Sequence, residues 1–251
     1  MGKILAVVNQ KGGVGKTTTA VNLTAALTEM GLDVLLCDFD PQANATSGLG
    51  IDKRKIHKSI YDVVVNGTDA DAAIQKTKFG DVLPSSADLA GAAVELLGIP
   101  DREYQLQKAL CAVKDEYDYI LLDCPPSLGI ITVNALCAAD SVLVPIQCEY
   151  FALEGLSQLM FTISRIKQHY NKELNVTGIL VTMHNNRLIL SMQVINELKK
   201  HYADKLFETT ISRNVKVSEA PGFGAPVYYH EKRSKGAIEY MNVAKQLAER
   251  I

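Results

Sequence analysis

The chain has 251 residues, 47% of them apolar, and a net charge of −2. This size suits one α/β domain over residues 1–251 with a single core. The near-neutral charge excludes a uniformly basic surface for nucleic acid, and no apolar run approaches the twenty or so residues that a membrane-spanning helix needs.

The charged residues are unevenly distributed along the chain. Residues 1–150 contain 12 Lys or Arg and 19 Asp or Glu, whereas residues 151–251 contain 14 and 9. The C-terminal part therefore carries either a local basic face or an ordinary solvated helix surface, and charge alone leaves both open. None of the five cysteines forms a C-x-x-C pair, so we expect buried, reduced thiols rather than a metal cluster. We expect a cytoplasmic protein, because the first apolar run is too short for a signal peptide.

Apolar runs typical of buried strands alternate with helical patterns along the chain. The strand-like runs are Ile4–Val8, Val34–Cys37, Tyr119–Leu122, Val142–Ile146 and Val176–Met183, with weaker candidates at Asp81–Leu83 and Leu206–Ile211. Helical spacing marks Thr17–Met30, Ala87–Leu97, Glu103–Lys114, Ile130–Ala138, Leu153–Tyr170, Leu190–Tyr202 and Lys235–Arg250. This alternation predicts an α/β fold with a doubly wound, mostly parallel sheet flanked by helices, and a ligand at the carboxyl ends of the strands.

The most informative segment is residues 9–18, which read Asn-Gln-Lys-Gly-Gly-Val-Gly-Lys-Thr-Thr between the first strand and the first helix. Its three glycines let backbone N–H groups turn inward and let a phosphate approach closely. Lys16 is then placed to reach the β- and γ-phosphates, and the Thr17 hydroxyl to ligate Mg²⁺. The segment predicts a phosphate-binding loop.

The loop departs from the common G-x-x-x-x-G-K-[ST] pattern, because Gln10 stands where the first glycine is expected and Lys11 adds a second lysine. This sequence resembles the deviant Walker A loop of the ParA/MinD family of P-loop ATPases. The resemblance implies that Lys11 reaches across a dimer interface to the partner's nucleotide. It also implies that ATP contacts the following loop residues: Lys11, Gly12, Gly13, Val14, Gly15, Lys16, Thr17 and Thr18.

Two acidic segments follow later strands. Asp38 and Asp40 end the second strand, and the family resemblance implies that Asp40 places the attacking water and engages Mg²⁺; Asp38 is the alternative, as a structural partner of the loop lysine. Asp123 ends another buried strand, as in a Walker B motif that holds Mg²⁺, often through water. The expected catalytic residues are therefore Lys11, Lys16 and Asp40, and the expected metal site is Thr17, Asp40 and Asp123. Residues 124–127, Cys-Pro-Pro-Ser, resemble the family's switch II.

The C-terminal part resembles the purine-binding and DNA-binding segments of the family. The resemblance implies that Asn185 and Arg213 contact the base. In the family pattern I-P-R-N-V-R-L-S-E-A-P this chain has Ser212 in place of the first proline and Lys216 in place of the second arginine, which keeps the charge but loses the planar guanidinium. Arg187 and Lys216 match basic DNA-binding positions. Plausible neighbours are Lys199, Lys200, Lys205 and Arg213.

Residues 147–155 and 218–221 are similar to the small chromosomal ParA, or Soj, subgroup. This resemblance implies an ATPase that uses ATP and Mg²⁺, forms a homodimer with ATP, and binds double-stranded DNA without sequence preference. It also implies activation by a ParB-type protein, chromosome or plasmid partitioning, association with the nucleoid and no stable association with membranes.

Three other readings share the loop. A MinD-like ATPase that positions the division site would need an amphipathic membrane-binding tail, and residues 240–251 lack clustered bulky apolar residues beside lysines. An iron–sulfur carrier would need paired cysteine ligands. Cys124 follows the Walker B aspartate, but no second cysteine forms a ligand motif with it. A biosynthetic ATP-dependent ligase would need a larger second region.

Overall fold

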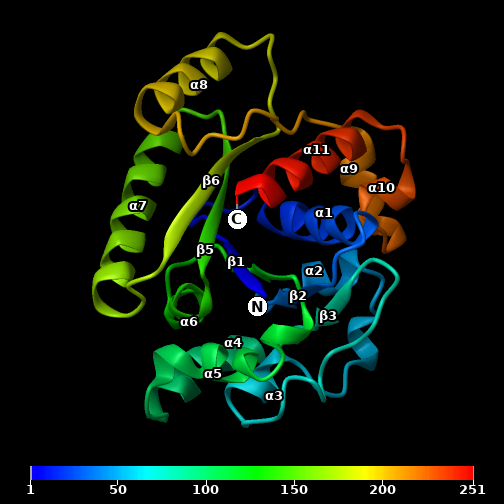
Figure 1. The fold of residues 1–251 in the computed structure, drawn as a ribbon, viewed down its shortest axis with the longest axis vertical. Coiled ribbons are helices and arrows are strands. Elements are labelled where there is room, and N and C mark those ends of the chain that lie inside the picture. Colours follow the sequence, from blue (N-terminus) through cyan, green and yellow to red (C-terminus); the bar gives the residue numbers. More distant parts are fainter. Residues whose placement is uncertain (1, 251) are drawn as a thin grey trace.

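The computed structural model describes residues 2–250, which form one parallel sheet covered by helices on both faces (Figure 1). The sheet has six strands in the order β3-β2-β4-β1-β5-β6, and every pairing between them is parallel. The strands are β1 (Lys3–Val7), β2 (Val34–Asp38), β3 (Asp81–Leu83), β4 (Tyr119–Asp123), β5 (Ser141–Gln147) and β6 (Asn175–Thr182). The predicted fold class is confirmed.

Alternate residues of the strands face two separate apolar cores. Along β1, Ile4 and Ala6 belong to one core, and Leu5 and Val7 to the other, which is the period of two expected for a strand. The central strands are buried on both faces and therefore consist almost wholly of apolar residues.

Different helices cover the two faces (Figure 1). One core includes residues of α3 (Ile60–Val64), α4 (Leu89–Glu95), α5 (Gln105–Cys111), α6 (Ile130–Ala138), α7 (Ala152–His169) and α8 (Ile189–Tyr202). The other includes residues of α1 (Lys16–Glu29), α2 (Asn44–Gly48), α10 (Val227–His230) and α11 (Lys235–Arg250). The short helix α9 (Val215–Glu219) follows the last loop that leaves the sheet.

The expected elements form with shifts of one to a few residues, and one expectation is wrong. The Leu206–Ile211 run forms no strand: Leu206 makes only an isolated bridge to Ile179, and Ser212 one to His184. The predicted helix over Glu103–Lys114 is shorter, since α5 covers Gln105–Cys111 between 3₁₀ turns at Arg102–Tyr104 and Lys114–Glu116.

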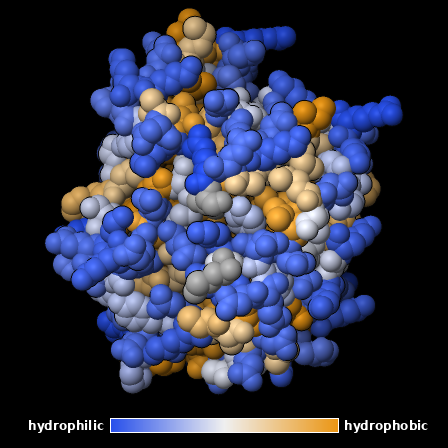
Figure 2. Space-filling model, viewed as in Figure 1, coloured by the Kyte–Doolittle hydropathy of each residue, from blue (hydrophilic) through white to orange (hydrophobic). Residues whose placement is uncertain are grey.

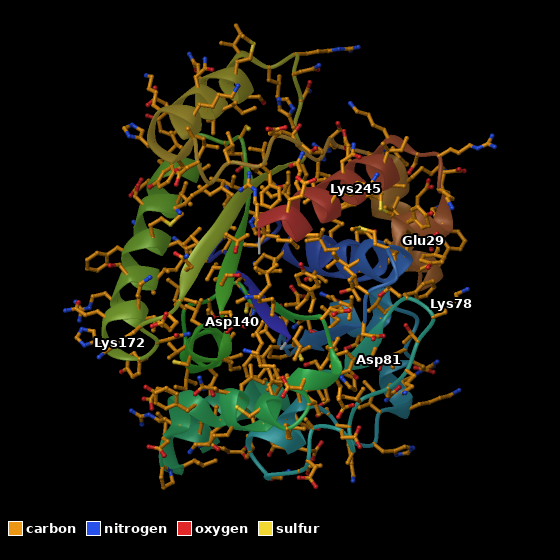
Figure 3. The ribbon with its side chains drawn as sticks, in the orientation of Figure 1. Glu29, Lys78, Asp81, Asp140, Lys172 and Lys245 are labelled. Carbon is orange, nitrogen blue, oxygen red and sulfur yellow. The ribbon has the colours of Figure 1, made fainter. Side chains whose placement is uncertain are left out.

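The C-terminal segment is tied to the first helix. Glu29, at the end of α1 (Figure 3), accepts hydrogen bonds from the Tyr228 hydroxyl at 2.8 Å and the Tyr229 hydroxyl at 3.0 Å. These two bonds lower the pKa of the Glu29 carboxyl. Helix α11 packs along α1, so the end of the chain lies over the helix that begins at Lys16 (Figure 1).

The outer surface in the view of Figure 2 is mainly hydrophilic, with scattered apolar areas. Among the helices within residues 2–250, none combines the length and the apolar character needed to cross a bilayer.

Candidate nucleotide-binding site

The glycine loop leaves β1 and enters α1 through two left-handed residues. Gly13 has φ +75° and Gly15, the residue before α1, has φ +87°. Residues with a side chain rarely adopt this backbone conformation, so both positions need glycine. The Thr182 hydroxyl at the end of β6 donates a hydrogen bond to the Val14 carbonyl at 2.8 Å and fixes the loop against the sheet. The backbone N–H groups at the start of α1 are thus held at the carboxyl edge of the sheet.

The first residues of the loop bind β5, α7 and the connection between them. Asn9 donates to the Pro145 carbonyl at 2.8 Å, and Gln10 donates to the Gly155 carbonyl at 2.8 Å. Gln10 therefore has a structural role where the common loop has glycine. Lys11 forms an ion pair with Glu149, and about half of each side chain is exposed. The loop and this connection consequently form one unit at the surface.

Lys16 is the cation inside the site. Its side chain is 6% exposed, and Nζ donates to the Lys11 carbonyl at 3.2 Å, within the same loop. Burial lowers the pKa of Lys16, and the carboxylates of Asp123 and Asp40 oppose this shift. The Lys16 ammonium therefore binds a carbonyl of its own loop. The charged oxygens of a phosphate bound at the loop would be stronger acceptors for it.

Two buried aspartates lie at neighbouring strand ends. Asp38 of β2 and Asp123 of β4 are paired in register, and Val7 of β1 is paired with Asp123 on the other side. Asp38 accepts two hydrogen bonds from Thr46, one from the backbone N–H and one from the hydroxyl, both at 2.7 Å. Burial nevertheless raises the pKa of Asp38 to about 6.

Asp123 is buried, and neither of its carboxylate oxygens has a hydrogen-bond partner of ordinary geometry within residues 2–250, although the Thr17 hydroxyl lies close enough to lower its pKa. Burial, together with repulsion from Asp38, raises the pKa of Asp123 well above its usual range. Burying a carboxylate without a partner costs free energy unless a cation binds it. Its oxygens are ligands that Mg²⁺ prefers, and the Walker B position beside the loop fits that ion.

Asp40 lies just beyond β2, at the edge of the site. Its side chain is 9% exposed, and one oxygen accepts the Gln42 N–H at 2.9 Å, which leaves the other oxygen free of hydrogen bonds within the described residues. Asp40 contributes to the electrostatic field at both Lys16 and Asp123. The structure thus brings Lys16, Asp40 and Asp123 close together, and their expected roles in catalysis and metal binding stay predictions.

A cavity of about 290 Å³ opens beside the loop, and we call it the nucleotide cavity. Its lining includes Gly15 and Thr18 of the loop region, Arg213 and Pro221 of the quoted family pattern, and three residues that sequence reasoning missed: Thr182, Met183 and Tyr240. Met183 has φ +49°, an unusual value for a residue other than glycine, at the point where β6 ends. Tyr240 comes from α11, and no sequence signal linked it to the loop.

A second cavity of about 510 Å³ adjoins the first, and we call it the basic cavity. Asn185 and Arg187 line it, and the Asn185 side chain accepts the Arg187 N–H at 3.0 Å. Asn185 is not among the residues that line the nucleotide cavity, so its expected contact with the base stays a prediction. Arg213 lines both cavities. The remaining lining residues are His184, Asn186, Thr210, Ser212, Lys235 and Glu239.

The other expected DNA-binding lysines lie outside the basic cavity. Lys216 is on α9 and pairs with Glu219 at 2.9 Å. Lys199 and Lys200 are in the last turn of α8, where Lys200 pairs with Glu197 at 2.5 Å. Their role in DNA binding stays a prediction.

The cysteines offer no sign of a metal cluster. Every cysteine is free, and Cys37, Cys124 and Cys137 are buried. Burial raises the pKa of the Cys124 thiol well above its usual range, which disfavours the thiolate that metals bind. Within residues 2–250, no group of three or more His, Cys, Asp or Glu side chains is arranged to hold a metal by itself.

Comparisons with known proteins indicate the family of the chain. Residues 2–176 match a protein family described as an AAA domain. The chain is 52% identical to the sporulation initiation inhibitor protein Soj of Bacillus subtilis, over 99% of this chain and 99% of that protein. It is 46% identical to the chromosome partitioning protein ParA of Myxococcus xanthus, over 100% of this chain and 89% of that protein.

Solved structures of related chains share the fold. A cobyrinic acid a,c-diamide synthase from Mycobacterium smegmatis, with bound ADP and magnesium, is 39% identical with a TM-score of 0.87, over 99% of this chain and 95% of that one. A plasmid partition protein from Borrelia burgdorferi is 27% identical with a TM-score of 0.78, over 100% and 99%. With its deviant glycine loop and full-length relatives, the chain belongs to the ParA/Soj family of chromosome-partitioning ATPases.

Proposed function

We propose that this protein hydrolyses ATP to ADP and phosphate with Mg²⁺ and drives the partitioning of a chromosome or plasmid. The observation that carries the proposal is a buried lysine, Lys16, at the end of the glycine loop, together with a buried carboxyl, Asp123, at the end of β4, close enough for each to shift the pKa of the other. Among the described residues, Lys16 lacks a paired anion and Asp123 lacks a paired cation, and a bound phosphate with its Mg²⁺ would supply both. The Myxococcus relative, named as a chromosome partitioning protein and similar over 89% of its length, supports the cellular role.

The residues around the loop then each have a role in binding or hydrolysis. Lys16 leaves the Lys11 carbonyl and donates to phosphate oxygens, and the loop N–H groups from Gly12 to Thr18 donate alongside it. Thr17, Asp40 and Asp123 hold Mg²⁺, which supplies charge neutralisation at the β- and γ-phosphates. Asp40, with a free oxygen at the edge of the site, orients the attacking water.

Lys11 supplies the link to a second subunit. Its side chain is 43% exposed and leaves the loop on the surface side, so it can reach beyond its own subunit. An ammonium that meets the partner's transferring phosphate stabilises charge in the transition state, as an arginine finger does. The dimer is then stable only while the γ-phosphate is present, which makes the protein a nucleotide switch.

DNA binding in this proposal needs only neutralised phosphates, and two-fold symmetry doubles the contacts. Arg187 and Lys216 make the principal contacts, and Lys199 and Lys200 extend the surface. A ParB-type protein stimulates hydrolysis and releases the dimer. We accordingly propose that the protein works in the cytoplasm, on the nucleoid.

The structure gives a MinD-like membrane role little support. Most apolar residues of α11 are buried in the core beside α1, among them Tyr240, Val243 and Leu247, and Ile238 alone among its large apolar side chains is exposed. A helix that lies on a bilayer instead needs a free apolar face. Contrary to the sequence-based expectation, chain length does not exclude a biosynthetic role. The alignment with the diamide synthase covers 99% of this chain and 95% of the synthase, so the two have nearly the same length.

The deciding experiment measures binding of the purified protein to a random-sequence DNA duplex and to anionic liposomes, each with ATP, with ADP and without nucleotide. Salt-sensitive DNA binding that appears only with ATP, without liposome binding, supports partitioning. Liposome binding that depends on ATP would move the assignment to a MinD-like role. Binding to neither would contradict the proposed DNA surface and favour a carrier or a ligase.

A further inference from the structure

The nucleotide cavity and the basic cavity share a wall, formed by Ser212 and Arg213. On one side of this wall lie Gly15 and Thr18 of the glycine loop region. On the other side lie Asn185 and Arg187. The placement of two consecutive residues therefore determines the shape of both cavities.

Glu239 of α11 holds this wall with two hydrogen bonds. Oε2 accepts the backbone N–H of Ser212 at 2.8 Å, and Oε1 accepts the Ser212 hydroxyl at 2.5 Å. The Glu239 side chain is only 12% exposed, and Lys235 Nζ lies 3.6 Å from Oε1. Hydrogen bonds to a carboxylate are about twice as strong as those between neutral groups, and shielding from water strengthens them further.

Other contacts fix the chain before the wall but hold it only weakly after it. Ile211 is bound on both sides, since its N–H donates to Val181 at 2.8 Å and its carbonyl accepts from His184 at 2.8 Å. The next backbone bond, from Arg213 to His184, is long at 3.4 Å. Glu239 therefore provides the last strong attachment before the chain reaches α9.

The anchor is itself linked to the glycine loop helix. Tyr240, the next residue on α11, lines the nucleotide cavity, and its hydroxyl lies 3.5 Å from the Thr19 hydroxyl of α1. Helix α11 packs along α1, so the carboxylate of Glu239 is fixed relative to the helix that begins at Lys16. The wall is thereby placed relative to the phosphate-binding loop.

Serine is essential to this arrangement. A proline at position 212, as in the family pattern, has neither a backbone N–H nor a hydroxyl, and could make neither bond to Glu239. The bond pair is thus a property of this chain's own Ser212.

We propose that Glu239 is a positioning residue for the nucleotide: through Ser212 it places the wall of the cavity beside the glycine loop, where the purine end of the nucleotide binds. This inference rests on the proposed function only in that the ligand is ATP. It assigns Glu239 no contact with the nucleotide itself.

The first test compares Glu239→Ala with Glu249→Ala, an exposed glutamate on the same helix. We expect Glu239→Ala to weaken binding of a fluorescent ATP analogue about tenfold, which corresponds to about 1.4 kcal/mol. Binding of inorganic tripolyphosphate, measured by competition, should not change, because it needs only the loop. Equal losses for both ligands would overturn the proposal, since they indicate general damage to the site.

The second test is a double-mutant cycle with Ser212→Pro. Adding Glu239→Ala to Ser212→Pro should cost no further ATP affinity, whereas a full tenfold loss in that background would contradict the proposal. Glu239→Gln, which keeps one acceptor oxygen, should lose less than Glu239→Ala and serves if the alanine variant folds poorly. Wild-type protein that binds ATP but no DNA would refute the partitioning role and leave this inference standing.

Discussion

Lys11 of the glycine loop is paired with Glu149, which lies 138 residues further along the chain, just after β5. The neighbouring loop residue, Gln10, donates to the Gly155 carbonyl near the start of α7. The lysine that we propose to serve the partner's nucleotide is thus held by a carboxylate of its own subunit.

Glu149→Gln should make ATP-dependent dimerisation easier, because Lys11 no longer has to leave an ion pair. Half-exposed pairs contribute about 0.2–1 kcal/mol, so the ATP concentration for half-maximal dimerisation should fall by about 1.5- to 5-fold. Analytical ultracentrifugation across an ATP titration measures this. Glu154→Gln on the nearby start of α7 is the control. Unchanged or weaker dimerisation in Glu149→Gln alone would show that Glu149 does not restrain Lys11.

Lys16→Ala should abolish nucleotide binding. Lys16 is the buried cation of the loop, and losing its charged hydrogen bonds to phosphate should reduce ATP affinity by about 100-fold or more. Calorimetric titration with MgATP measures this, and Lys3→Ala, an exposed lysine at the start of β1, is the control. Retention of ATP affinity within a factor of a few would sink the proposed role of the loop.

Without nucleotide, the protein should lose stability as the pH rises from about 4 to above 6. The folded-state pKa of Asp38, about 6, lies above the unfolded value of 3.8, so the folded state binds more protons in this window. The free energy of unfolding therefore falls as pH rises through it. Asp123, whose pKa is also raised, acts in the same direction.

Urea unfolding at several pH values checks this expectation. Asp38→Asn should flatten the pH dependence between pH 4 and 7, and saturating MgATP should also reduce it by supplying a cation to the acidic group. Identical pH profiles for the wild type and Asp38→Asn would assign the dependence to other groups.

The local motifs were readable from sequence, whereas contacts across the fold were not. The glycine loop, Asp40 and Asp123 could be placed because each follows a buried strand, and parallel strands end at one edge of a sheet. Tyr240 and Glu239 could not, because α11 carries only an ordinary amphipathic pattern. The short helices α2, α3 and α9 were missed because five residues are too few to show helical periodicity.

The error at Leu206–Ile211 has a physical cause. The run looks like a strand, but its backbone bonds β6 only near its two ends, where Phe207 donates to Ile179 and Ile211 donates to Val181. Between them the Thr209 N–H donates to the Gln246 side chain, so no continuous ladder forms. Apolar character there reflects burial of Phe207 and Ile211 rather than strand pairing.

Asp40→Ala should bind ATP but hydrolyse it slowly, and so trap the dimer on DNA. Asp40 is one of three proposed metal ligands and the only group proposed to orient water, so hydrolysis should suffer more than binding, by about 100-fold or more. Phosphate release and the lifetime of the DNA complex after dilution measure this. A monomeric Asp40→Ala protein at saturating ATP would count against the switch.

Arg187→Glu should weaken DNA binding without weakening ATP binding. Arg187 lines the basic cavity and lies outside the nucleotide cavity, so its charge is available to DNA phosphates. Each dimer loses two phosphate contacts, and the slope of log affinity against log salt should therefore decrease by about 2. The control is Lys172→Glu, because Lys172 is an exposed lysine just before the start of β6, at the opposite edge of the sheet from the site (Figure 3). Wild-type DNA affinity and salt slope in Arg187→Glu would place the DNA surface elsewhere on the dimer, and equal losses in both variants would indicate a general charge effect.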